Sequence, residues 1–162
     1  MSTMDINVTI NGVSQGHSVE PRRRLAEFLR EDAGLLGTNV SCEAQICGAC
    51  TVLVDGKPAS ACTFLAADTD GRDVTTIEGV ASDGVLSPVQ AAFRDHAALQ
   101  CGFCTPGFVL AATALLEECD DPDEEMIKHF LDGNVCRCTG YVQILEAVRD
   151  AASRVRESKS DG

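Results

Sequence analysis

The chain has 162 residues, nine cysteines, a formal net charge of −12 and a pI near 4.5. This acidity disfavours nucleic acid as a partner, because affinity for nucleic acid depends on Lys and Arg side chains that neutralise phosphates. No apolar run approaches the roughly 20 residues of a membrane span and no secretory signal is visible, so we expect a cytoplasmic protein whose cysteines bind metal rather than form disulfides.

The N-terminal residues predict a β-hairpin followed by a short helix. Apolar and polar side chains alternate over 5–10, which is typical of a half-buried strand. Asn11-Gly12 is a hairpin turn signal, and the return strand is expected to follow it. Pro21 suits a first helical position and Gly34 offers a stop, so a helix is expected between them.

The next stretch carries a cysteine motif. Cys42, Cys47 and Cys50 have the spacing C-x4-C-x2-C, which with Cys62 is the plant-type [2Fe–2S] signature. Three thiolates would come from one tight loop and the fourth from a separate element. Gly48 lies between two of these cysteines, where a side chain would crowd the sulfides and where a positive φ suits glycine. A structural zinc site is the alternative, although zinc sites usually pair cysteines in two short knuckles.

The rest of the first half predicts a small sheet. Strands are expected over 51–54, 58–62 and 73–77, which with one crossing helix gives an α+β domain covering 1–80. Residues 81–87 are small and polar, so they predict a linker to a second domain.

The second domain, 81–162, has a helical pattern. Residues 108–116 are apolar on nearly every side, as in a helix at the centre of a bundle. Asp121-Pro122 predicts the N-cap and first turn of the next helix. The last helix is expected to give way to a flexible tail at about 156–162.

A second cysteine group lies in this helical half. Cys101 and Cys104 precede the apolar helix, and Cys136 and Cys138 precede the last one. Unpaired N–H groups at helix N-termini stabilise thiolates, so the pattern predicts a metal site. From spacing alone, zinc stays open as the metal. Cys119 lies outside both groups and is expected to be a small buried hydrophobe.

Three motifs resemble a known family. Residues 47–56, 100–107 and 133–141 look like the iron–sulfur subunit of the molybdenum hydroxylase, or xanthine oxidase, family. The resemblance covers about 5–155. It is strongest to the separate small subunit of bacterial three-subunit enzymes, such as aerobic carbon monoxide dehydrogenases and N-heterocycle dehydrogenases.

The resemblance implies a fold, two cofactors and two partners. The fold is a β-grasp, ferredoxin-like domain followed by an all-α four-helix bundle, each with one [2Fe–2S] cluster. The bundle cluster would face a large molybdopterin-binding subunit, and the sheet-domain cluster a medium FAD-binding subunit, in a heterotrimer or a dimer of heterotrimers. Gln100 and Cys138 match the family's positions that approach the pterin. The implied cluster ligands are Cys42, Cys47, Cys50, Cys62, Cys101, Cys104, Cys136 and Cys138.

The first cysteine loop departs from the family's usual pattern at two positions. Ser41 and Gln45 stand where the family commonly has glycine. Such positions can require backbone angles that other residues adopt only at a cost. The departure concerns the shape of the loop and the potential of the cluster more than the cluster itself.

The sequence therefore predicts an electron-transfer subunit of an oxidoreductase. It shows no acid–base pair or nucleophile arrangement, so we expect no catalytic residue here and place the chemistry on substrate in another chain. The rival hypotheses are a stand-alone two-cluster ferredoxin-type carrier and a zinc-stabilised interaction module. The substrate stays open among carbon monoxide, purines, other N-heterocycles, aldehydes and acyl thioesters.

Overall fold

The computed structural model describes residues 2–160 and has an α+β fold. Its strands form one mixed sheet in the order β2-β1-β5-β3-β4. The strands are β1 (Met4–Ile10), β2 (Val13–Val19), β3 (Thr51–Val54), β4 (Lys57–Ser60) and β5 (Asp73–Thr75). The helices are α1 (Leu25–Glu27), α2 (Pro88–Asp95), α3 (Thr105–Glu118), α4 (Glu124–Leu131) and α5 (Val142–Ser160), with a π-helical turn η1 (Phe28–Asp32) and 3-10 turns η2 (Ala66–Thr69) and η3 (Ile77–Gly79).

The predicted hairpin is confirmed. β1 and β2 are antiparallel, and Asn11 and Gly12 adopt φ values of 50° and 79° at the turn. β1 also pairs in parallel with β5, which places it inside the sheet. Its alternating residues Ile6, Val8 and Ile10 are at most 2% exposed, so this strand supplies much of the sheet's core.

The first helix starts later than the sequence predicts. Arg24 is still extended and forms a β-bridge with Leu65, so Pro21 lies before the helix rather than inside it. The helix begins where the Glu27 side chain accepts the Arg24 N–H, at 3.4 Å. It continues from α1 directly into η1, which ends before Gly34, whose φ is 72°.

The second half contains four helices, α2 to α5. α3 is apolar and buried along most of its length, as the sequence predicts, and it contacts the other three helices. The start of α4 is corrected: Asp123, not Asp121, is the N-cap, and its carboxylate accepts the Met126 N–H at 2.8 Å. Pro122 therefore lies outside the helix. α5 runs to Ser160, so residues 156–160 of the expected tail are helical, whereas 161–162 lie outside the described residues.

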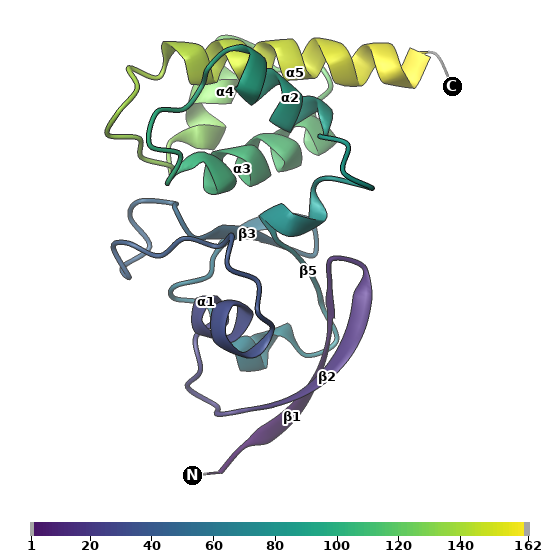
Figure 1. Cartoon of the computed structure of the whole chain (residues 1–162), viewed down its shortest axis with the longest axis vertical. Helices are drawn as coiled ribbons and strands as arrows, with labels where there is room; N and C mark the ends of the chain where they lie inside the picture. Colours follow the sequence, from purple (N-terminus) through teal and green to yellow (C-terminus); the bar gives the residue numbers. More distant parts are fainter. Residues whose placement is uncertain (1, 161–162) are drawn as a thin grey trace.

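The two halves pack directly on each other. Figure 1 shows the four helices at one end of the long axis and the β1–β2 hairpin at the other, with α3 next to β3. Leu53 of β3 packs with Leu110 and Ala114 of α3 in a small apolar cluster. No helix within residues 2–160 has the length and hydropathy needed to cross a bilayer.

A polar clamp joins the hairpin to the start of the connection. Asn11 Nδ2 donates to Thr76 Oγ1 at 3.0 Å, and the Thr76 N–H donates back to Asn11 Oδ1 at 2.8 Å. Thr76 is fully buried. The segment that leads to the helices therefore begins from a fixed point on the sheet.

Candidate metal centres

The first cysteine group comes together at the edge of the sheet half that faces the helices. Cys42, Cys47 and Cys50 lie on the loop before β3, and Cys62 follows β4. The Ala61 N–H donates to the Cys50 carbonyl at 3.3 Å, which brings Cys62 beside Cys50. Cys50 and Cys62 are buried, whereas Cys42 and Cys47 are half-buried. The loop and the separate element predicted from sequence are both present.

Backbone N–H groups converge on one sulfur of this group. The N–H groups of Ala44, Ile46 and Cys47 each lie 3.4 Å from the Cys42 Sγ. They lower the pKa of the Cys42 thiol to about 6. The loop is therefore arranged to stabilise a thiolate, the form in which cysteine binds metal.

The backbone conformation of this loop shows why glycine is common in the family at one of the two departing positions. Gln45 has a φ of 56°, in the left-handed region where glycine is preferred. Ser41 is not among the described residues with positive φ, so only one of the two positions carries strain. Glu43 is also left-handed, with a φ of 54°, which the sequence did not predict; its carboxylate is held by Arg24 Nη1 at 2.6 Å.

Gly48 is required for a reason that the sequence did not supply. It has a φ of 66°, as expected, but a Cβ here would lie 2.4 Å from the Gly133 carbonyl oxygen. The residue that excludes a side chain thus belongs to the other half of the chain. Gly48 lies where the two cysteine segments meet.

The second cysteine group lies at one end of the helices. Cys104 is the N-cap residue of α3, and Cys136 is buried beneath it. The sulfurs of Cys101 and Cys138 are 3.5 Å apart and both residues are exposed. The predicted meeting of the four cysteines at helix N-termini holds for α3, whereas Cys136 and Cys138 lie on the loop that precedes α5.

Hydrogen bonds to sulfur also shape this group. Burial acts to raise the pKa of Cys136, but hydrogen bonds from the Thr139 hydroxyl and N–H, 3.1 and 3.4 Å from its sulfur, together with those from the Cys138 N–H and the Cys104 thiol, outweigh it and lower the pKa to about 7. The Phe103 N–H lowers the pKa of Cys101. The Cys101 N–H acts to lower the pKa of Cys138, but the Cys101 thiol and burial raise it overall.

Each group also has one member that burial keeps protonated. Burial raises the pKa of Cys50 and of Cys104 to about 12. Because metal ligands must be thiolates, metal binding at these two positions would release protons.

The cysteine sulfurs are in contact in pairs, and this arrangement can be compared with the ligands that a metal ion or an iron–sulfur cluster requires. Thiol–thiol contacts join Cys42 to Cys47, Cys50 to Cys62, Cys101 to Cys138 and Cys104 to Cys136. Within residues 2–160, no group of three Cys, His, Asp or Glu side chains is arranged to hold a single metal ion. A [2Fe–2S] cluster takes four cysteine thiolates, two on each of its irons. Two pairs per group fit that donor set.

Two residues that sequence reasoning did not single out support the second group. Thr139 donates to the Cys136 sulfur, and the Tyr141 hydroxyl accepts the Cys136 N–H at 2.9 Å. The Tyr141 ring meets Phe108 of α3 edge-on, with centroids 6.3 Å apart. Both residues lie in the motif 133–141, which was the available signal. The predicted residue Gln100 is exposed and adjacent to Cys101, and Cys119 is half-buried at the end of α3.

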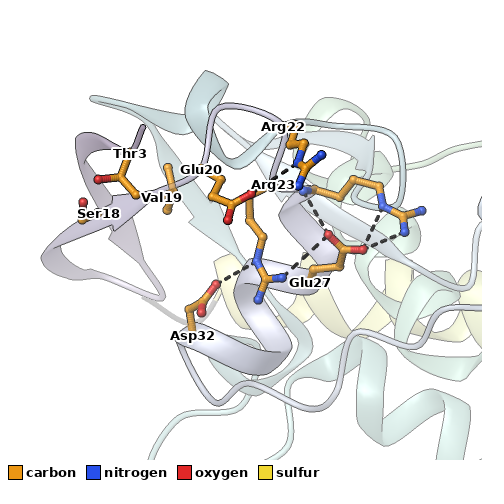
Figure 2. Close-up of a pocket in the computed structure, with 9 residues that line it drawn as sticks. Thr3, Ser18, Val19, Glu20, Arg22, Arg23, Glu27 and Asp32 are labelled. Carbon is orange, nitrogen blue, oxygen red and sulfur yellow. Dashed lines mark hydrogen bonds and ion pairs between the residues drawn. The ribbon is translucent and has the colours of Figure 1, made fainter. Parts of the chain in front are cut away.

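A surface hollow of about 580 Å³ contains no cysteine in its lining. It is lined by residues of β2, α1 and the segment between them, together with Thr3 and Asp32 (Figure 2). Arg23 Nε lies 3.0 Å from Asp32, and Arg24 Nη2 lies 2.7 Å from Glu27, so these guanidinium groups are neutralised within the chain. None of the predicted site residues lines this hollow.

Comparison with known proteins identifies two [2Fe–2S] domains in the chain. Residues 23–91 match the family described as "2Fe-2S iron-sulfur cluster binding domain", and residues 76–149 match "[2Fe-2S] binding domain". The nicotine 6-hydroxylase small subunit of Paenarthrobacter nicotinovorans is 49% identical over 94% of this chain and 92% of its own length. The nicotinate dehydrogenase small FeS subunit of Eubacterium barkeri is 45% identical over 95% and 98%, respectively.

A solved structure matches the fold over almost the whole chain. The crystal structure of quinoline 2-oxidoreductase from Pseudomonas putida 86 contains a chain that aligns with a TM-score of 0.92 and 42% identity, covering 97% of this chain and 98% of that one. Such identity over nearly full length leaves the relationship in no doubt. The chain belongs to the family of small iron–sulfur subunits of molybdenum hydroxylases.

Proposed function

We propose that this chain is the electron-transfer subunit of a molybdenum hydroxylase and carries electrons from the molybdopterin centre of a large subunit to FAD on a medium subunit. The observation that carries the proposal is the presence of two groups of paired cysteine sulfurs in a chain of this family. Two bound [2Fe–2S] clusters supply the redox chemistry, each accepting and releasing single electrons.

The protein's own residues hold and tune these clusters. We propose Cys42, Cys47, Cys50 and Cys62 as ligands of one cluster and Cys101, Cys104, Cys136 and Cys138 as ligands of the other. The N–H groups around Cys42 and the Thr139 hydroxyl at Cys136 stabilise negative charge on sulfur, which raises the potential of a bound cluster. The buried members of each group exclude water from one side of the site.

Exposed apolar side chains around each group suit contact with partner subunits. Near Cys101 and Cys138 these are Leu99, Phe103 and Val142, which are 41–57% exposed. We assign this surface, with Gln100, to the large molybdopterin-binding subunit. Exposed aromatic and aliphatic side chains beside a redox centre are typical of interface cores that become buried on assembly.

The corresponding surface on the other half surrounds the first cysteine loop. Ile46 and Leu36 are 68% and 63% exposed there. We assign this surface to the medium FAD-binding subunit, in a heterotrimer or a dimer of heterotrimers located in the cytoplasm. Several relatives are themselves named as subunits of a complex, which supports an assembled enzyme over a stand-alone carrier.

We further propose that the halves are a β-grasp domain over 1–80 and a four-helix bundle over 81–162, joined by 81–87. The sheet order and the four consecutive helices support this division. The nicotine, nicotinate and caffeine enzymes among the relatives act on N-heterocycles by name, which favours that substrate class for the assembled enzyme.

Metal analysis and native purification test the proposal together. We expect about four irons and as many acid-labile sulfides per chain, and two distinguishable EPR signals after reduction. A molybdopterin-containing chain and a flavin-containing chain should co-purify with this one. A colourless protein that holds zinc, or a chain isolated alone from its native host, would refute the proposal.

A further inference from the structure

The two cysteine segments are joined by a direct backbone hydrogen bond. The Val135 N–H donates to the Cys47 carbonyl oxygen at 2.9 Å. Cys47 belongs to the first cysteine group, and Val135 is bonded to Cys136 of the second. A single hydrogen bond therefore connects a proposed ligand of one cluster to the residue adjoining a proposed ligand of the other.

One buried amide side chain supports this contact. Asn134 is 7% exposed, and its Nδ2 donates to the Gly48 carbonyl oxygen at 2.9 Å and to Thr51 Oγ1 at 3.3 Å. The Thr51 hydroxyl donates to the same Gly48 carbonyl at 2.8 Å. Asn134 and Val135 are consecutive, as are Cys47 and Gly48, so the two segments are joined by side-chain and backbone hydrogen bonds at neighbouring residues.

The surrounding backbone leaves no room for this junction to shift. A Cβ on Gly107, in the first turn of α3, would lie 2.2 Å from the Gly48 carbonyl oxygen. A Cβ on Gly48 would lie 2.6 Å from Asn134 Nδ2. The backbone at Gly48 thus lies in close contact with Gly107 and with Asn134. The hydrogen-bond donors around the Gly48 carbonyl fix its orientation.

We propose that Asn134 is a positioning residue: its amide holds the Gly48 carbonyl so that the Cys47–Val135 hydrogen bond stays closed, and this bond sets the rate of electron transfer between the two cysteine-held centres. The inference rests on the proposed function. Electronic coupling decays more slowly along covalent and hydrogen bonds than across a gap, so a closed bond favours transfer. In each transfer one electron leaves the Cys136 side and arrives on the Cys47 side, while no covalent bond changes and no proton moves.

The test uses the assembled holoenzyme and an isosteric substitution. Asn134→Asp keeps the side-chain shape but removes the Nδ2 donor and presents a second acceptor to the Gly48 carbonyl. Because a lost hydrogen bond weakens local structure by about 1 kcal/mol, we expect hydrogen–deuterium exchange of the Val135 amide to rise about fivefold to tenfold. The rate at which the two EPR signals re-equilibrate after flash photoreduction with deazaflavin should fall by more than the change in the difference between the two midpoint potentials, measured by redox titration, accounts for.

Asn39 provides a matched control. Its Nδ2 donates to the Phe103 carbonyl at 2.9 Å, so it also joins the two halves by an amide-to-carbonyl bond, but away from Val135. Asn39→Asp should leave the Val135 exchange rate and the electron-transfer rate unchanged. An equal effect of both substitutions would show that general loosening, not the Asn134 contact, is responsible, and would overturn the inference.

A second pair of variants covers the case in which Asn134→Asp fails to assemble. Thr51→Val removes the hydroxyl, which donates to the Gly48 carbonyl and accepts from Asn134 Nδ2, and leaves only the Thr51 N–H, at 3.1 Å, as the second donor to that carbonyl. Thr51→Ser restores the hydroxyl. We expect the valine variant to show faster Val135 exchange and slower transfer, and the serine variant to recover both. Unchanged transfer in the valine variant would refute the inference, whereas an unaltered complex without iron and sulfide would refute the proposed function itself.

Discussion

The two cysteine groups reach similar sets of paired sulfurs by different structural means. The first depends on a single loop with left-handed residues at Glu43, Gln45 and Gly48. The second depends on helices, because Cys104 caps α3 and Cys136 packs in the core that α3 shares with α5. The first site is therefore determined mainly by local backbone conformation, and the second mainly by how the helices pack.

The difference also explains their exposure. Cys50 on the loop and Cys62 after β4 are buried within the sheet core, whereas Cys42 and Cys47 are half-buried. The helix-end site leaves Cys101 and Cys138 open to a partner. At this second site the donors to sulfur are the Phe103 N–H and the N–H and hydroxyl of Thr139, which lie just before the starts of α3 and α5.

The largest expected effect separates the two sites by removing one of them. Cys104→Ser should reduce the iron content from about four to about two per chain and abolish substrate-driven flavin reduction. The flavin-side diaphorase activity should persist, because the first group is untouched. Cys119 lies outside both groups, so Cys119→Ser is the control and should leave the iron content and both activities unchanged. Loss of both activities in a normally assembled Cys104→Ser complex would contradict the proposed order of carriers.

Glycine substitutions distinguish local strain from contact between the halves. Gly48 and Gly102 both have positive φ. A Cβ at Gly48 would clash with the Gly133 carbonyl oxygen, whereas a Cβ at Gly102 would have no atom of the described residues within 4 Å. Gly48→Ala should lower the free energy of unfolding by about 3 kcal/mol or more and reduce iron at both sites. Gly102→Ala should cost about 1 kcal/mol. Anaerobic chemical denaturation and iron analysis measure both, and equal losses would mean that the junction does not matter.

Glycine should stabilise the chain at the strained position Gln45 and slightly destabilise it at Ser41. Gln45→Gly relieves a left-handed conformation, so we expect the free energy of unfolding to rise by at most about 1 kcal/mol, since the side chain also accepts a hydrogen bond from Thr63. Ser41→Gly should lower it by a few tenths of a kcal/mol, because it only adds freedom to the unfolded chain. An equal rise in the free energy of unfolding for Ser41→Gly would show that glycine stabilises the loop regardless of the backbone conformation at the substituted position.

The smallest effect concerns the ion pairs that anchor the first loop. The Arg24 guanidinium lowers the pKa of Glu27, so the folded state favours the carboxylate. This stabilisation is present above the ordinary Glu pKa and is lost as pH falls through the lowered value. Glu27→Gln should therefore destabilise the chain at pH 7 by less than about 1 kcal/mol, with a difference that shrinks below about pH 4. If the difference in free energy of unfolding between the wild type and Glu27→Gln did not change with pH, the effect would come from packing and not from the charge of Glu27.

Much of the fold follows from local sequence patterns. The alternation in β1, the Asn11-Gly12 turn and the apolar length of α3 each reflect interactions among residues close in sequence. The pairing of Cys42 with Cys47 is likewise local, because the spacing and the loop's own N–H groups determine it. Such features need no knowledge of the rest of the chain.

The features that sequence reasoning missed depend on contacts between distant residues. Arg24 stays extended because it bridges to Leu65, so Pro21 cannot start the helix. Asn134 and Gly48 are 86 positions apart, and the reason for each residue appears only when the two halves meet. Neither contact leaves a periodic signal in the sequence.

The contacts between the two halves have a consequence for assembly. A hinge between the halves would have to part Leu53 from Leu110 and break the hydrogen bonds from Asn134 to Gly48 and from Val135 to Cys47 before it could open. The two cysteine groups are therefore held at one separation within the chain. In the complex that we propose, the large and medium subunits would have to match that separation.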